Sequence, residues 1–74
     1  MSADRIAQRF QDGLAAHQRM ALAEAEHAYR EVLGDSPSHA AALRLLGLIY
    51  LERGKLRAAW SLLRRSVEAN SHLA

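Results

Sequence analysis

Apolar residues recur along the chain in four stretches, each with the period of an α-helix. In the first stretch Ile6, Phe10 and Leu14 follow one another at intervals of four, which places them on one face of a helix. The second and fourth stretches also carry a single apolar stripe. The third is apolar around most of its circumference, which is typical of a helix packed on several sides. The predicted helices cover about residues 3–18, 22–33, 38–53 and 55–70.

Turn residues separate some of these helices more clearly than others. The segment Gly34–Pro37 is the clearest break, because Gly34 can take the left-handed conformation that ends a helix and Pro37 suits the first turn of the next one. Gly54 is expected to end the third helix. The turn after residue 18 contains neither glycine nor proline. Ser2 is the expected N-cap of the first helix.

Composition favours an all-α fold and excludes several kinds of site. Half of the residues are apolar, and most of these are alanine (15) and leucine (12), which are good helix formers. Cysteine is absent, which excludes a disulfide framework, a thiolate zinc site and a cysteine nucleophile. No apolar run approaches the roughly 18 residues of a membrane span, and no signal peptide is visible. We therefore expect residues 1–74 to form one soluble, cytoplasmic domain.

The net charge of +2 conceals opposite charges in the two halves of the chain. Residues 1–37 carry four arginines against six acidic residues, whereas residues 38–74 carry five arginines and one lysine against two acidic residues. This asymmetry suits head-to-tail stacking or a polar protein partner better than a nucleic-acid stripe. The best basic cluster is interpreted as a solvated face of the fourth helix, with an acidic partner or a nucleic-acid backbone as the alternative. Its members are Lys55, Arg57, Arg64 and Arg65.

No arrangement of residues indicates catalysis or metal binding. The four histidines are never three or four residues apart, so no two of them lie on one helical turn as metal ligands would. Serine catalysis needs an oriented histidine and an acid, and no motif for them is present. The glycines are too scattered to form a phosphate-binding loop. We expect no enzyme activity in these 74 residues, and no metal or cofactor.

The second half of the chain repeats the first with a period of 34 residues. Eight residue pairs at this spacing are identical, among them Gly13/Gly47, and large apolar residues also correspond, as Tyr29 and Leu63 do. Two helices within a 34-residue period are the signature of the tetratricopeptide repeat, which the chain resembles closely. The residues that carry the resemblance are Gly13, Ala16, Ala25, Tyr29, Val32 and Pro37 in the first unit and Leu43, Leu46, Gly47, Tyr50, Ala59, Leu63 and Ser66 in the second.

The resemblance implies an α-solenoid of two helix-turn-helix repeats with four antiparallel helices. The repeats would cover about residues 6–39 and 40–73. The glycines at positions 13 and 47 would let the two helices of each pair approach closely, and Ala25 and Ala59 would be the small partners across that contact. Two charged residues of the first helix stand where the family prefers large apolar ones, which fits a first repeat with one side facing water.

The resemblance also implies a function in protein binding. Tetratricopeptide domains bind peptides or helices of other proteins in a concave groove formed by the first helix of each pair. One subclass grips the C-termini of chaperones with lysine and asparagine, but Phe10 and Leu14 occupy two of those places here, so that role is disfavoured. The alternative is that the groove packs on a neighbouring repeat or subunit. The expected groove residues are Phe10, Leu14, His17, Gln18, His39, Ala41, Arg44, Leu48, Leu51 and Glu52.

The fourth helix has an apolar face that, in this family, a following helix would cover. Repeat arrays generally need about three repeats and a polar cap. Two repeats therefore predict a fragment of a longer protein that forms a homodimer through this face. A lone tryptophan is more often a core residue, which is the competing interpretation of Trp60. The expected self-association residues are Leu56, Trp60, Leu63 and Val67.

A second hypothesis concerns the parent protein. Alanine- and leucine-rich repeats with many arginines are similar to those that precede bacterial glycosyltransferase domains. The chain would then recruit substrate for a larger enzyme. A catalytic domain after residue 74 would favour this hypothesis, whereas further repeats would favour the interaction module.

Overall fold

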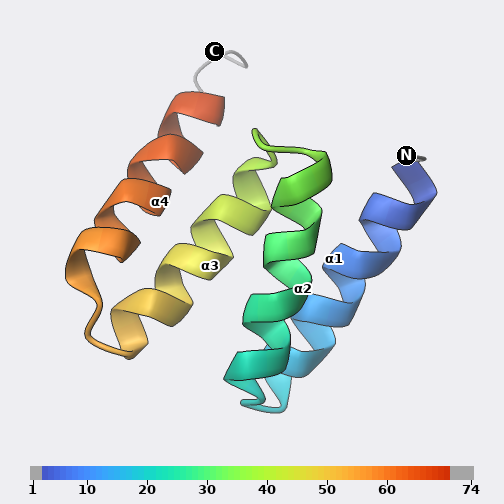
Figure 1. Ribbon diagram of the computed structural model, residues 1–74, viewed down its shortest axis with the longest axis horizontal. Coiled ribbons are helices and arrows are strands. Elements are labelled where there is room, and N and C mark those ends of the chain that lie inside the picture. The colour runs from blue at the N-terminus through green and yellow to red at the C-terminus, as the bar shows by residue number, and fades with distance from the viewer. Residues whose placement is uncertain (1–2, 71–74) are drawn as a thin grey trace.

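The computed structural model describes residues 3–70, which fold into four α-helices that reverse direction at short turns (Figure 1). Consecutive helices pack on one another, the first on the second, the second on the third and the third on the fourth. The expectation of an all-α fold is confirmed. No helix of the described part is long and apolar enough to cross a membrane. The helices are α1 (Ala3–Gln18), α2 (Leu22–Asp35), α3 (Ala40–Glu52) and α4 (Leu56–Asn70).

Helix α3 supplies more of the core than any other helix of residues 3–70, and it packs against α2 on one side and α4 on the other. This explains why its sequence is apolar around most of its circumference. Its largest fully buried side chains are Leu43 and Ile49, and those of α2 are Tyr29 and Val32. Burial of each such side chain stabilises the fold by about 1.5–3 kcal/mol. The buried residues of α3 are Ala42, Leu43, Leu46, Gly47, Ile49 and Tyr50.

The turn between α2 and α3 departs most from the predicted helix ends, whereas α1 ends at Gln18 and α2 begins at Leu22, as predicted. Gly34 was expected to end α2 in the left-handed conformation, but the helix continues through it to Asp35, and its φ is not positive. Gly54 does have a φ of +76°, as expected for the end of α3. In the first turn Met20 adopts a φ of +62°, so a non-glycine residue takes the left-handed conformation there.

The boundary between α2 and α3 is set by residues on either side of Pro37. Proline disfavours the helical conformation for the residue before it, and Ser36 has a φ of −137° and a ψ of 80°. The helix that follows begins at Ala40, two residues later than predicted. Its N-cap is His39, whose Nδ1 accepts a hydrogen bond of 3.1 Å from the backbone N–H of Ala42. The predicted N-cap of α1, Ser2, lies outside the described residues.

The two glycines at helix contacts make the close approach that the sequence predicts. A Cβ atom at Gly13 would lie 2.5 Å from Cε1 of Tyr29, and one at Gly47 would lie 2.9 Å from Cγ of Leu63 and 3.3 Å from the carbonyl oxygen of Ala59. The side chain nearest to Gly13 is therefore that of Tyr29, whereas at Gly47 the backbone of Ala59 is among the nearest groups, in agreement with the predicted role of Ala59. A phenol ring can fill the position beside Gly13 because glycine leaves room for it.

A polar network joins α2 to α3 and so holds the first pair of helices on the second. The Tyr50 hydroxyl donates to Oε2 of Glu26 at 2.8 Å, and Nη1 of Arg53 donates to Oε1 at 2.5 Å. Arg30 contacts both Glu26, at 2.9 Å, and the Tyr50 hydroxyl. Burial alone would raise the pKa of Glu26, but the hydrogen bond from Tyr50 and the charges of Arg30 and Arg53 outweigh it and lower that pKa below 4.5.

The lowered pKa predicts how this network responds to acid. A carboxylate with a depressed pKa stabilises the fold above its unfolded-state pKa, and the stabilisation is lost as the pH falls through the folded-state pKa. At pH 7 we expect Glu26→Gln to lower the free energy of unfolding by about 1 kcal/mol, because charge-assisted hydrogen bonds become neutral ones. The difference from the unsubstituted protein should shrink steadily below pH 4.5 in urea titrations.

Glu24, the other glutamate near the start of α2, provides a matched control for this prediction. Glu24 pairs with Arg19 at 2.9 Å, but its side chain is 69% exposed, against 17% for Glu26. Because exposed ion pairs contribute little to stability, Glu24→Gln should change the free energy of unfolding by less than about 0.5 kcal/mol, both at pH 7 and below pH 4.5. Equal losses of unfolding free energy in Glu26→Gln and Glu24→Gln would show that the α2–α3 network does not stabilise the fold as described.

Candidate functional site

Side chains of α1 and α3 meet at two places among the residues predicted to form a groove. The rings of Phe10 and His39 lie with their centroids 4.9 Å apart, near the start of α3. At the other end of α3, Nε2 of His17 lies 3.7 Å from Oε1 of Glu52. The structure thus brings four of the ten predicted residues into contact across two helices. We call the surface formed by the ten residues the α1–α3 face.

Tyr29 of α2 lies beneath this face and was not predicted to belong to it. Its ring centroid is 5.9 Å from that of Phe10, and its hydroxyl is 3.3 Å from Nδ1 of His17. Burial raises the pKa of the Tyr29 hydroxyl, and the nearby positive charge of Arg44 offsets part of that rise. The phenol therefore stays neutral at physiological pH. It contacts both Phe10 and His17 on the inner side of the α1–α3 face.

Of the six remaining residues of the α1–α3 face, four are apolar and one, Arg44, is charged. Leu14, Ala41 and Leu48 are half-buried, while Leu51 is 46% exposed. Gln18, the last residue of α1, is exposed. Arg44 is exposed as well, and none of the ion pairs described within residues 3–70 joins it to an acidic side chain.

His39 has a structural role in addition to its place on the face. Its Nδ1 caps α3, so the ring is held at the start of that helix, where Phe10 packs against it. This role could not be predicted from the sequence, because the usual N-cap residues are serine, threonine, aspartate and asparagine. The cap fixes the orientation of one residue of the α1–α3 face without any ligand.

The outer surface of α4, which we call the α4 face, exposes most of the residues predicted to mediate self-association. Leu56 and Trp60 are each 64% exposed and Val67 is 70% exposed, while Leu63 is half-buried because it packs against Gly47. The interpretation of Trp60 as a core residue is therefore wrong. A hollow of about 400 Å³ lies on this face, and the guanidinium of Arg64 is 5.4 Å from the centre of the Trp60 ring. The residues that line the hollow are Trp60, Leu63, Arg64, Val67 and Glu68.

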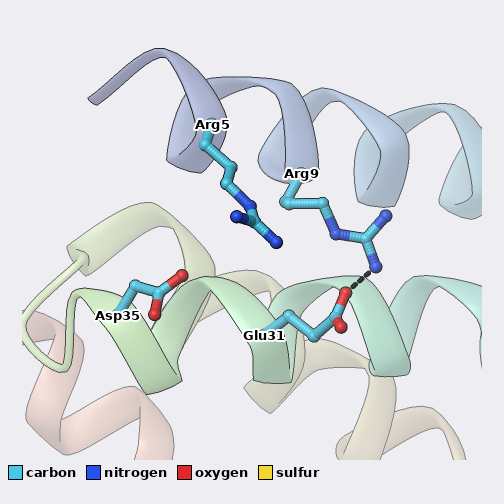
Figure 2. Close-up of a pocket in the computed structure, with 4 residues that line it drawn as sticks. All are labelled: Arg5, Arg9, Glu31 and Asp35. Atoms are coloured by element: carbon cyan, nitrogen blue, oxygen red, sulfur yellow. Dashed lines mark ion pairs between the residues drawn. The ribbon is translucent and has the colours of Figure 1, made fainter. Parts of the chain in front are cut away.

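A smaller polar hollow of about 180 Å³ lies between α1 and α2 (Figure 2). Arg5 and Arg9 extend from α1 toward Glu31 and Asp35 of α2, and Arg9 forms an ion pair with Glu31. Two positive and two negative side chains neutralise one another here, so the hollow is a polar contact between helices. No group of three or more metal-ligating side chains occurs within the described residues.

Comparisons with known proteins give no match. No protein-family model matches the chain, and neither the curated proteins nor the solved structures include one significantly similar to it. The functional argument therefore depends on the two surfaces just described.

Proposed function

We propose that the chain is a protein-interaction module of the tetratricopeptide type that binds a peptide segment of another protein on the α1–α3 face. The contacts made by the two glycines support the repeat. Gly13 lies against Tyr29 and Gly47 against Leu63. The two glycines are 34 residues apart in the sequence, and so are Tyr29 and Leu63. The same close contact thus occurs in both helix pairs, as it would in two copies of one unit.

The observation that carries the proposal is the apolar strip of the α1–α3 face. Its middle holds Leu14, Leu48 and Leu51, and its ends hold charged groups on Arg44 and Glu52. An apolar strip with a few polar groups at defined places is the usual character of a peptide-binding surface, in which apolar contacts supply affinity and polar ones supply specificity.

Two substitutions to aspartate on different faces test this function. A phage-displayed library of 12-residue peptides is panned against the protein, and the selected peptides are synthesised and titrated by fluorescence polarisation. We expect Leu51→Asp to weaken their binding by at least tenfold, because it places a charge within the apolar strip. Leu56→Asp, at an exposed leucine on the α4 face, should leave the affinity unchanged.

Both positions are at least partly exposed, so circular dichroism should show both variants folded. Loss of binding in Leu56→Asp alone would move the binding site to the α4 face. A library that yields no binder would refute the proposed function.

A second proposal, self-association through the α4 face, is favoured by the exposure of Trp60, Leu56 and Val67. The four apolar residues of this face are spaced four, three and four apart, a pattern that reads the same from either end of the helix. Two antiparallel copies of α4 can therefore place Leu56 opposite Val67 and Trp60 opposite Leu63 of the second copy. In a two-fold contact of this kind, the same four residues are buried on both copies.

A further inference from the structure

We infer that the α1–α3 face selects an extended segment with an acidic residue, an apolar residue and a basic residue at positions i, i+2 and i+4. The inference rests on the proposed function and specifies its ligand. The acidic residue would pair with Arg44, the apolar residue would contact Leu48, and the basic residue would pair with Glu52.

The charges that make this selection lie in the second turn of α3, at Arg44, and at its last residue, Glu52. Arg44 is exposed, and its charge has no acidic partner among residues 3–70. Glu52 is 44% exposed, and its carboxylate is 3.7 Å from Nε2 of His17. Because that contact uses one oxygen of a carboxylate that still faces solvent, the negative charge remains accessible to a ligand.

The spacing of these charges sets the spacing in the ligand. Arg44 and Glu52 are eight residues apart on one helix, so the rise between them is about 12 Å. An extended peptide advances about 3.3 Å per residue, and four residues therefore cover about 13 Å. Leu48 is the midpoint of the interval on α3, and residue i+2 is the midpoint of the peptide. Since alternate side chains of an extended chain point the same way, residues i, i+2 and i+4 can all face α3.

The direction of α3 favours the basic residue of the ligand at its proposed place. Glu52 is the last residue of α3, and the C-terminal end of a helix favours positive charge.

Synthetic nine-residue peptides with fluorescein labels test the inference by fluorescence polarisation at low ionic strength, where exposed charge pairs are least screened. The first peptide has the core Glu-Ser-Leu-Ser-Lys. The controls are Glu-Ser-Leu-Ser-Glu, Lys-Ser-Leu-Ser-Lys and the rearranged core Glu-Ser-Lys-Ser-Leu. We expect the first peptide to bind about three- to tenfold more tightly than each control, which is the range for two exposed charge pairs.

A charge reversal in the protein provides the matched test. Arg44→Glu changes an exposed position and should not affect folding, which circular dichroism checks. It leaves two negative charges on the α1–α3 face, so its preference should switch from Glu-Ser-Leu-Ser-Lys to Lys-Ser-Leu-Ser-Lys. Such a switch cannot result from a loss of structure.

The outcomes separate this inference from the function on which it rests. If all four peptides bind equally, or if the preference does not switch in Arg44→Glu, the face binds peptides without reading charge and the inference is wrong. The inference is also wrong if none of the four binds while library-selected peptides bind in a Leu51-dependent manner. If neither the designed nor the selected peptides bind, the proposed function fails as well.

Discussion

Replacing Gly13 with alanine is expected to lower the free energy of unfolding by up to about 2 kcal/mol, although alanine is the better helix former. The new methyl group would lie 2.5 Å from Cε1 and 2.7 Å from Cδ1 of Tyr29. Because that ring is fully buried, either the ring or the two helices α1 and α2 must move to relieve the overlap. Overpacking of this kind costs about 1–3 kcal/mol, from which a gain of roughly 1 kcal/mol in helix propensity is subtracted.

The same substitution at Gly34 should change the free energy of unfolding in the opposite direction. Gly34 lies within α2, has no positive φ, and has no atom within 4 Å of the place where a Cβ would be. Gly34→Ala should therefore raise the stability by about 0.5–1 kcal/mol through helix propensity alone. Urea titrations of both variants measure these two changes in the free energy of unfolding. A stabilising Gly13→Ala would show that α1 and α2 are not in close contact at Tyr29.

The helices could be predicted from the sequence because periodicity is a local property of the chain. The stripe Ile6, Phe10 and Leu14 indicates α1 whatever it packs against. The end of α2 could not be predicted from Gly34, because glycine permits the left-handed conformation without requiring it. Pro37 set that boundary instead, through its effect on Ser36.

The candidate site was predictable only where it follows one helix face. Its members on α1 and α3 share a face because their spacing is helical, and the contacts of Phe10 with His39 and of His17 with Glu52 agree with that placement. Tyr29 was missed because it lies on α2 and reaches these residues only through the space beside Gly13. Such a contact depends on how two helices pack, which their separate patterns do not contain.

The position of Trp60 depends on packing in the same way. Its place in the apolar stripe of α4 predicts a face but does not say what covers the face, and in residues 3–70 the indole is 64% exposed. Leu63, in the same stripe, is half-buried only because Gly47 of α3 leaves room for it. Two neighbours in one pattern thus contribute to different surfaces, one to the core and the other to the α4 face.

Replacing Trp60 with serine is expected to raise the dissociation constant for self-association by more than tenfold. Buried tryptophans are among the residues that contribute most to interfaces, and a two-fold dimer loses two of them with each substitution. The expected dimer is weak, because one pair of helices about 22 Å long buries less surface than a standard interface. Sedimentation equilibrium over micromolar to millimolar concentrations measures it.

The control for this prediction is Leu51→Ser, which removes a partly exposed leucine from the α1–α3 face. It should leave self-association unchanged, and both variants should unfold within about 0.5 kcal/mol of the unsubstituted protein, because neither side chain belongs to the core. A chain that stays monomeric at millimolar concentration would refute self-association. Equal weakening by the two substitutions would place the contact elsewhere than on α4.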